Sequence, residues 1–103
     1  MTLTQLSYIV AVAQHRNFGA AAEASHVTQP TLSMQVQKLE EDLGVVIFDR
    51  SQQPIRATAV GEQILSQARI VLAETQKIRD LTSSEQNEVR GSISIGVIPT
   101  LSP

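Results

Sequence analysis

The feature that most constrains this chain is the stretch from Thr28 to Gly44, TQPTLSMQVQKLEEDLG. Thr28 can cap the amino end of a helix through its hydroxyl, Pro30 fits a first turn, and Gly44 can end the helix in a left-handed conformation. Apolar residues recur at spacings of four, three and four, which gathers them on one narrow helical stripe; they are Leu32, Val36, Leu39 and Leu43. The stretch therefore predicts an amphipathic helix over residues 29–43 with one face in a core.

Two further helical patterns precede this one. The apolar residues Leu6, Ile9, Val10 and Ala13 share one face of a predicted helix from about Thr2 to Gln14. The stretch FGAAAEAS, residues 18–25, predicts a second and shorter helix, and we expect Val27 to fill the corner before the third. A helix, a brief turn and a helix within about 26 residues have the dimensions of a helix-turn-helix.

The pattern changes after Gly44. Two short β-prone runs, VVIFDR and IRATA, surround the polar turn SQQP, which predicts a small hairpin, or wing, over residues 45–57. Thr58 can cap another helix, over residues 59–89, which has no internal proline. Thirty residues make a rod of roughly 45 Å.

This long helix carries a seven-residue repeat, in which Ile64, Val71 and Ile78 are one series. Such a stripe is typical of a coiled coil. It can pack on its own domain, but a rod of this length overhangs a small core, so we expect a homodimer. The predicted dimerisation residues are Ile64, Leu65, Ala68, Val71, Leu72, Thr75 and Ile78.

The last residues alternate as a strand does. From Gly91, the run GSISIGVIPT places Ile93, Ile95 and Val97 between small polar residues. A lone strand has no sheet partner, so we expect the sequence to be the front of a longer protein, with residues 90–103 forming a hinge and the first strand of a second domain.

Composition limits the function classes. The 103 residues can hold one small domain and an extension, and without cysteine nothing suggests a disulfide framework, a thiol nucleophile or a zinc knuckle. No apolar run approaches the roughly 20 residues of a membrane span, and the start MTLTQLSYIV lacks the basic region of a signal peptide. We therefore expect a cytoplasmic protein without a membrane partner.

The residues argue against an enzyme. His15 and His26 are the only histidines, and their positions predict a helix end and a turn. The sequence has neither a nucleophile elbow nor a glycine-rich phosphate loop, and its acidic run lacks metal-ligand spacing. We expect no metal and no cofactor.

The face opposite the apolar stripe has the chemistry of a recognition helix. Its side chains are small or uncharged, so the backbone can approach a groove wall while amides and hydroxyls meet base edges. Its first turn lacks a carboxylate, which leaves the helix amino end open to a phosphate. In the wing, Arg50 and Arg56 flank the turn and can reach the sugar-phosphate backbone or the minor groove. These features together predict binding to double-stranded DNA.

The net charge of −2 is unusual for such a role. The carboxylates of Glu40, Glu41 and Asp42 lie at the far end of the predicted helix, clear of DNA that enters at the amino end. Two alternatives remain: the polar face is an ordinary solvated surface, or the chain is a winged-helix protein-interaction module without DNA binding. A salt titration of DNA binding separates the readings.

One family resemblance covers roughly residues 1–90. The stretch FGAAAEASHVTQPTLSMQVQKLEEDLGVVIFDR, followed by TAVG at residues 58–61, resembles the signature of the LysR-type transcriptional regulators. That resemblance implies an amino-terminal winged helix-turn-helix over residues 1–58, a dimerising linker helix, and a carboxy-terminal α/β effector-binding domain in the full-length protein, which is usually a tetramer. It also makes RNA polymerase a candidate partner and leaves the effector unknown.

The resemblance implies which residues face DNA. Two departures stand out: Met34 occupies a position where the family often has arginine, and Gln53 one where a basic residue is common. Together with the polar face of the helix, the predicted DNA-binding residues are Thr28, Gln29, Pro30, Thr31, Ser33, Met34, Gln37, Lys38, Arg50, Gln52, Gln53 and Arg56.

Within the family, QHRNF, VTQPTLS and GVIPTLSP are similar to the peroxide-sensing OxyR branch. Thr100 matches a threonine at the rim of the effector site in that branch, and a strand-end threonine satisfied by backbone is the equal alternative. The resemblance implies a possible place in the oxidative-stress response.

Overall fold

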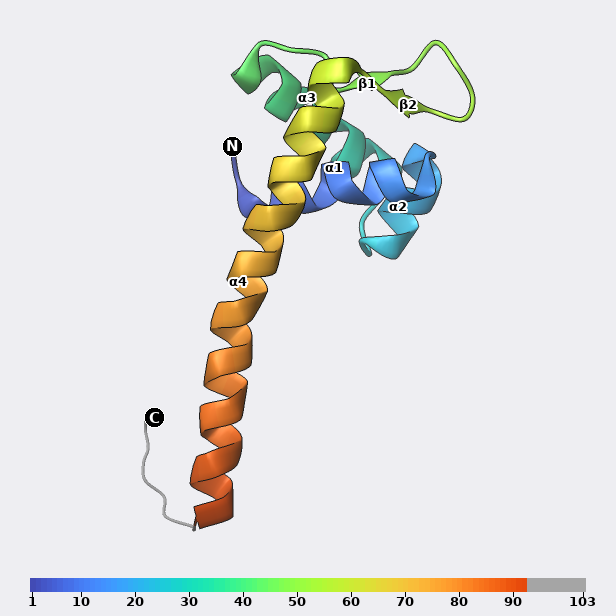
Figure 1. Cartoon of the computed structure of the whole chain (residues 1–103). Helices are drawn as coiled ribbons and strands as arrows, with labels where there is room; N and C mark the ends of the chain where they lie inside the picture. The colour runs from blue at the N-terminus through green and yellow to red at the C-terminus, as the bar shows by residue number, and fades with distance from the viewer. Residues whose placement is uncertain (93–103) are drawn as a thin grey trace. The chain divides into compact units, whose positions relative to one another are not determined.

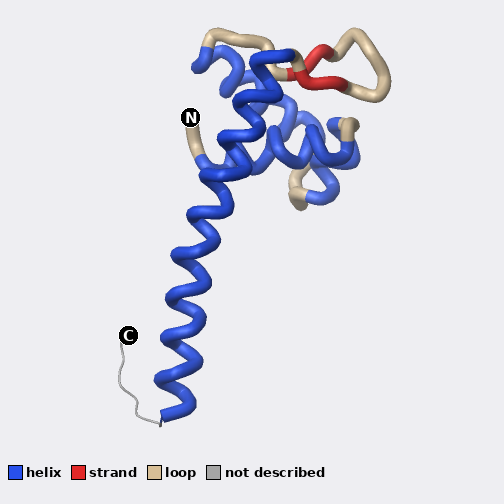
Figure 2. Tube along the Cα trace, viewed as in Figure 1, coloured by secondary structure: helices blue, strands red, loops and turns tan. Residues whose placement is uncertain are grey.

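The computed structural model describes residues 1–92, with side chains up to Ser83. Residues 1–72 form one unit and a second begins at Ala73; we treat each by itself. The elements are α1 (Leu3–His15), α2 (Phe18–Ala24), α3 (Gln29–Leu43), β1 (Phe48–Asp49), β2 (Arg56–Ala57) and α4 (Ala59–Ser92). Figure 2 shows that helix dominates and that the two strands form one small hairpin. The predicted fold class, a winged helix-turn-helix followed by a long helix, is confirmed.

Side-chain caps fix where the first three helices begin. Thr2 and Gln5 form a reciprocal capping box at α1, with both N–H···O distances 3.0 Å. Asn17 caps α2 by accepting a hydrogen bond from the Ala20 N–H at 2.8 Å. Thr28 caps α3 as predicted, and Gly44 ends it at φ 71°, in the left-handed region. Local sequence thus determined the bounds of α3.

One apolar core joins these helices to the wing. The predicted stripe residues Leu32, Val36 and Leu39 are fully buried, and α1 adds Val12, which the periodicity did not select. Val27 packs against the core at the corner between α2 and α3, as predicted. The remaining buried apolar residues are Leu6, Ile9, Phe18, Ala21, Ala22, Ile47, Phe48, Ile55, Leu65 and Ala68.

The wing is short and is attached closely to the start of α4. β1 and β2 pair antiparallel, with Phe48 opposite Ala57 and Asp49 opposite Arg56. The Thr58 hydroxyl accepts from the Gly61 N–H at 3.0 Å, which confirms its predicted cap, and donates to the Val46 carbonyl at 2.6 Å. A Cβ at Gly61 would collide with the carbonyl oxygen of Ile47. A residue without a side chain is therefore required where α4 passes the base of the wing (Figure 1).

Two predictions need correction. Leu43 is 37% exposed because the last turn of α3 has passed the edge of the core, and Glu40 occupies the buried position near that end. The long helix ends at Ser92 rather than 89, so Gly91 and Ser92 are helical and not the start of a strand. The rest of the predicted hinge and strand, residues 93–103, lies outside the described residues.

The described part of the second unit is helix alone. Between Ala73 and Ser83 every side chain is exposed except Thr75, which is half-buried. Ile78 and Leu81 are 64% and 71% exposed, and Lys77 pairs with Glu74 at 2.9 Å. Among the described residues, no helix combines the length and the apolar character that a membrane span needs.

Candidate nucleic-acid interface

The amino end of α3 is an exposed, uncharged surface. Thr28, Gln29, Pro30 and Thr31 are all exposed, and the first turn contains no acidic residue. The Thr28 hydroxyl oxygen accepts from the Thr31 N–H at 3.4 Å and donates to the Thr31 hydroxyl oxygen at 2.9 Å. This bonding fixes the first turn without adding charge to it.

The outward face of α3 continues this surface. Met34 is 49% exposed, Gln37 and Lys38 are exposed, and Ser33 is half-buried. These residues lie opposite the buried stripe, as the sequence predicted. The Gln37 amide donates to the Glu41 carboxylate at 3.5 Å, so the charge of Glu41 lies near the carboxyl-terminal half of the face and away from the first turn.

A hollow of about 360 Å³, which we call the α3 hollow, lies where α2, α3 and the wing meet. Gln29 and Ser33 contribute to it from α3, and Arg50 and Gln53 from the wing. The other lining residues are Asn17, Phe18, Gly19 and Ile55. The structure thus gathers four predicted DNA-binding residues around one concave surface.

α2 also contributes to the α3 hollow, which was not predicted from the sequence. A Cβ at Gly19 would lie 3.2 Å from Oδ1 of Asn17 and 3.3 Å from Oε1 of Gln29, so Gly19 lies beside the side chain of the first residue of α3. Asn17 lines the same hollow while it caps α2. An asparagine just before FGAAAEA is typical of a helix cap, and this signal in the sequence could have indicated that Asn17 lies at the start of α2.

The wing residues predicted as one DNA-binding set are split by the structure. Arg50 and Gln53 line the α3 hollow, whereas Gln52 and Arg56 line a second hollow of about 540 Å³ beside α1 and the start of α4. The second hollow contains charges of both signs, from Arg16, Arg56, Arg69, Asp49 and Glu62. The wing therefore presents two different surfaces.

Asp49 is held at the start of the wing turn. Its carboxylate accepts from the Ser51 hydroxyl at 2.6 Å and from the Ser51 N–H at 3.0 Å. These hydrogen bonds, the hydroxyl bond first, lower the pKa of Asp49 below its usual value because they stabilise the charged form. The turn thus favours the charged form of the carboxylate that precedes Arg50 in the chain.

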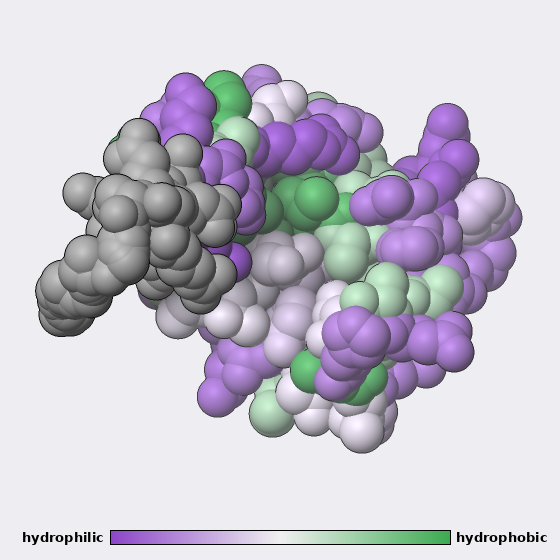
Figure 3. Space-filling view, turned by 90° about the horizontal axis from the view of Figure 1, so that it is seen from below, coloured by the Kyte–Doolittle hydropathy of each residue, from purple (hydrophilic) through white to green (hydrophobic). Residues whose placement is uncertain are grey.

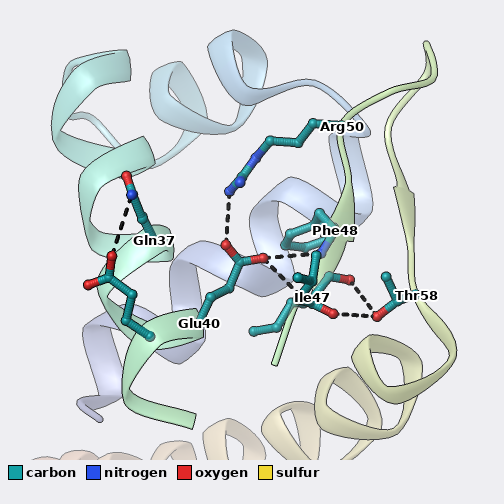
Figure 4. A network of polar contacts seen from close by, with 8 residues as sticks. Gln37, Glu40, Ile47, Phe48, Arg50 and Thr58 are labelled. Atoms are coloured by element: carbon teal, nitrogen blue, oxygen red, sulfur yellow. Dashed lines mark hydrogen bonds and ion pairs between the residues drawn. The ribbon is translucent and has the colours of Figure 1, made fainter. Parts of the chain in front are cut away.

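Arg50 has intramolecular partners that the sequence did not predict. Its Nη2 lies 3.3 Å from Oε1 of Glu40, and its guanidinium carbon lies 5.0 Å from the centroid of the Phe18 ring. The side chain is 45% exposed, so it is half covered by the protein itself. Figure 4 shows Arg50 extending from the wing toward Glu40 of α3.

The predicted dimerisation seam needs a correction. Leu65 and Ala68 are 1% and 2% exposed in the core of their own chain, so they offer no free surface to a partner. Ile64, Val71 and Leu72 are half-buried and pack against the same core. The reason is the close passage of α4 along the domain at Gly61.

Large apolar side chains do reach the surface elsewhere. In Figure 3, green apolar residues are visible between purple hydrophilic ones. In the first unit the exposed ones on α4 are Val60 and Ile70, at 38% and 55%. In the second unit Ile78, from the predicted seam, is exposed and Thr75 is half-buried.

The other site predictions concern metals and an effector. Within the described residues, no group of three or more histidine, cysteine or acidic side chains is placed to hold a metal ion. Thr100, the predicted effector contact, lies outside the described residues.

The known proteins that this chain is similar to are transcriptional regulators. The family model described as "Bacterial regulatory helix-turn-helix protein, lysR family" matches residues 3–62. The DNA-binding transcriptional dual regulator OxyR of Escherichia coli (strain K12) is 41% identical over 103 residues, which are 100% of this chain and 34% of that protein. The HTH-type transcriptional regulator EstR of Acinetobacter baylyi is 39% identical over 102 residues, 99% of this chain and 34% of its own. The chain thus spans about a third of the length of these relatives.

Solved structures agree. The full-length OxyR C199D variant from Pseudomonas aeruginosa matches with a TM-score of 0.77 and 56% identity, over 82% of this chain and 28% of that one. The BenM DNA-binding domain in complex with benA site 1 DNA matches with a TM-score of 0.79 and 32% identity, over 84% of this chain and 97% of that one. These similar proteins are regulators, and the second was solved on DNA.

Proposed function

The chain belongs to the LysR family of bacterial regulatory helix-turn-helix proteins, and we propose that it binds double-stranded DNA sequence-specifically and regulates transcription. The observation that carries the proposal is the exposed, carboxylate-free start of α3 beside the α3 hollow. In this proposal α3 enters the major groove and the wing contacts the backbone or the minor groove. The DNA complex of the similar BenM domain supports it.

The exposed residues of α3 fit base edges. Gln29 lies in the first turn, where its amide can pair bidentately with adenine, and Ser33 can donate to or accept from either base type. Pro30 and Met34 are apolar and exposed, which suits contact with a thymine methyl group. Lys38 is the exposed cation of this face and can reach a phosphate.

Binding selection on random duplexes, followed by a salt titration on the selected site, tests the proposal. Each neutralised phosphate contributes about 0.9 to the slope of log K against log salt, so several contacts give a steep slope. A protein-interaction module, which the net charge of −2 favours as the alternative, would enrich no duplex and give no binding to titrate.

We further propose a homodimer, and a tetramer for the full-length protein. Exposed Ile70 in the first unit, and exposed Ile78 and Leu81 in the second, are apolar surface that self-association would cover. Val71 is a poor site for a test because it packs on its own core; Ile78→Asp avoids this problem. Light scattering should give a dimer for wild type and a monomer for Ile78→Asp, with Lys77→Asp as the exposed control. A monomeric wild type at high micromolar concentration would refute the dimer.

A dimer would present two copies of α3. Recognition helices of a two-fold dimer are about 34–36 Å apart, one helical turn of DNA. The selected site should then be an interrupted palindrome with half-sites in successive major grooves. Motifs without two-fold symmetry would exclude this docking.

We propose a role in the peroxide response. Several relatives that are 41% identical over the whole chain are named hydrogen peroxide-inducible genes activators. A chimera in which this chain replaces the matched third of the Escherichia coli protein tests whether it serves the same sites. Peroxide-dependent transcription should be restored in a strain that lacks the relative. A chimera that is made but activates none of those promoters would indicate a different set of target sites.

The proposed role defines further expectations. Bacterial promoters are in the cytoplasm, so we propose that compartment, with RNA polymerase as a candidate partner. A proximity-labelling experiment on the protein in growing cells should recover RNA polymerase subunits, and a variant that binds no DNA should recover fewer.

A further inference from the structure

Glu40 is a buried carboxylate on a helix that we propose enters DNA. The residue is 8% exposed, and its Oε2 accepts from the Ile47 N–H at 2.8 Å and from the Phe48 N–H at 3.3 Å. Its Oε1 accepts from Arg50 Nη2 at 3.3 Å. Both carboxylate oxygens thus bind the same segment of chain, which leads into the wing (Figure 4).

Arg50 extends this link to α2. Its guanidinium lies over the ring of Phe18, the first residue of α2, at 5.0 Å from the centroid. The Phe18 ring in turn meets Phe48 of β1 edge to face, with centroids 6.2 Å apart. The four side chains therefore join α2, α3 and the wing in one polar and aromatic cluster, which we call the wing anchor: Phe18, Glu40, Phe48 and Arg50.

Contacts outside the wing anchor attach the wing to the core and to α1 and α4. Ile47 and Ile55 are buried, the Ile55 N–H donates to the Arg16 carbonyl at 3.2 Å, and the Thr58 N–H donates to the Ile47 carbonyl at 2.9 Å. Each strand has two residues, and the tip, residues 51–54, is exposed throughout. Glu40 is the α3 residue that hydrogen-bonds the wing segment within the described residues. The hydrogen bonds are directional, so they specify where the wing leaves α3 and not merely that it stays near.

We propose that Glu40 and Arg50 are positioning residues for DNA binding: the buried Glu40 carboxylate holds Arg50 and the start of the wing so that the wing and α3 contact one duplex together. This inference rests on the proposed DNA-binding function. Arg50 then acts mainly by orienting the wing, while the phosphate contacts come from other cations and from backbone N–H groups.

Electrostatics alone predicts the opposite sign for Glu40. If Arg50 serves only as a phosphate ligand, Glu40 competes with DNA for its guanidinium, and removing the negative charge should tighten binding. If Glu40 positions the wing, its removal should weaken binding although the protein becomes less negative. The direction of the change therefore separates the two roles.

The test compares Glu40→Gln with Glu41→Gln, a neighbour on the same helix whose charge is exposed. Dissociation constants are measured on the duplex selected for wild type, together with hydroxyl-radical footprints. We expect Glu40→Gln to weaken binding roughly tenfold, since hydrogen bonds to a buried charged group are lost. Glu41→Gln should bind as tightly as wild type or slightly tighter.

The footprint gives a readout that a general loss of stability would not move. Glu40→Gln should lose protection on the DNA flank covered by the wing and keep the major-groove protection due to α3. Uniform weakening of the whole footprint, or tighter binding by Glu40→Gln, would overturn the inference.

Arg50→Gln keeps the test valid if Glu40→Gln folds poorly, and a double-mutant cycle extends it if both variants fold. Arg50 is half exposed, so Arg50→Gln should fold and give the same loss of flank protection. The double variant should bind no more weakly than either single one, because both remove the same link. Additive losses would contradict a shared positioning role. Absence of DNA binding by wild type would refute the proposed function itself, whereas wild-type binding with a tighter Glu40→Gln would refute the positioning role alone.

Discussion

α3 and the wing are both parts of the candidate DNA surface and both bury apolar side chains, but the wing is in addition tied to α3 by the hydrogen bonds of a buried carboxylate. Three apolar side chains of α3, those of Leu32, Val36 and Leu39, are fully buried. The wing buries Ile47, Phe48 and Ile55, but its strands have two residues each, its tip is exposed, and its first residues donate directional hydrogen bonds to Glu40. Apolar burial contributes most of the stability but specifies orientation weakly, whereas charged hydrogen bonds contribute less and specify it well. Substitutions at the buried apolar positions should therefore change folding, and those at the Glu40–Arg50 link should change how DNA is contacted.

The largest effect should come from shortening a buried apolar side chain of α3. Leu32→Ala should lower the free energy of unfolding by about 2–5 kcal/mol, because it leaves a cavity in a packed core. Urea unfolding measures it. Leu43→Ala, on the same helix but 37% exposed, is the control and should cost far less. If both variants lost the same free energy of unfolding, the distinction between the buried apolar residues of α3 and its exposed last turn would be wrong.

The next effect concerns the base of the wing. Gly61→Ala should destabilise the protein by about 1–3 kcal/mol, since the new Cβ collides with the Ile47 carbonyl oxygen. In an exposed helix the same change would stabilise by about 1 kcal/mol. The sign of the change in the free energy of unfolding therefore shows whether Gly61 is in close contact with the wing.

Hydrogen exchange locates the disturbance. The Thr58 N–H donates to the Ile47 carbonyl at 2.9 Å, and its exchange should accelerate in Gly61→Ala. Ser66→Ala, at an exposed position of α4, should leave it unchanged. A stabilised Gly61→Ala with normal exchange would show that α4 and the wing are not in close contact.

A smaller, local effect is expected on the exposed face of α3. Gln29→Ala should relax one base position of the selected motif by about 1–3 kcal/mol, because a bidentate amide contact is lost. Gln35→Ala is the matched control, since its side-chain oxygen accepts from the Gln5 amide at 3.0 Å and is directed within the protein. An unchanged motif for Gln29→Ala would remove this residue as a reader and leave it a solvated first-turn residue.

The smallest effect is a pH dependence in the wing turn. Ser51→Ala should raise the pKa of Asp49 toward the usual value of 3.8, because the hydroxyl bond is the largest cause of the lowering. A depressed folded-state pKa contributes stability above the unfolded value of 3.8 that is lost as pH falls through the folded value. The contribution is small because Asp49 is solvated.

An NMR titration of the Asp49 carboxyl measures this shift. Ser51→Ala should titrate at higher pH than wild type, and Ser66→Ala should not. An unchanged pKa in Ser51→Ala would mean that the turn bonds do not persist in solution.

Much of the fold followed from local patterns. The cap at Thr28, the end at Gly44 and the buried residues Leu32, Val36 and Leu39 could be read from the sequence, because capping chemistry and helical periodicity act within a few residues. The amphipathic character of α3, with apolar residues inside and uncharged polar residues outside, also follows from residues close together in the sequence. The DNA-binding roles of the individual outward residues stay predictions.

Tertiary structure alone decided which charged groups are paired within the chain and which apolar side chains are buried in its core. Glu40 looked like one member of an acidic run, and Arg50 like an exposed cation. Their pairing links the end of α3 to the wing, and the Phe18 ring beside Arg50 comes from the separate helix α2. Leu65 and Ala68 fit a dimer seam by periodicity, yet their own core covers them. A periodic pattern determines which side chains share a face, but the surface that covers this face is set by how separate elements pack, and that packing depends on shape and bonding between residues far apart in the chain.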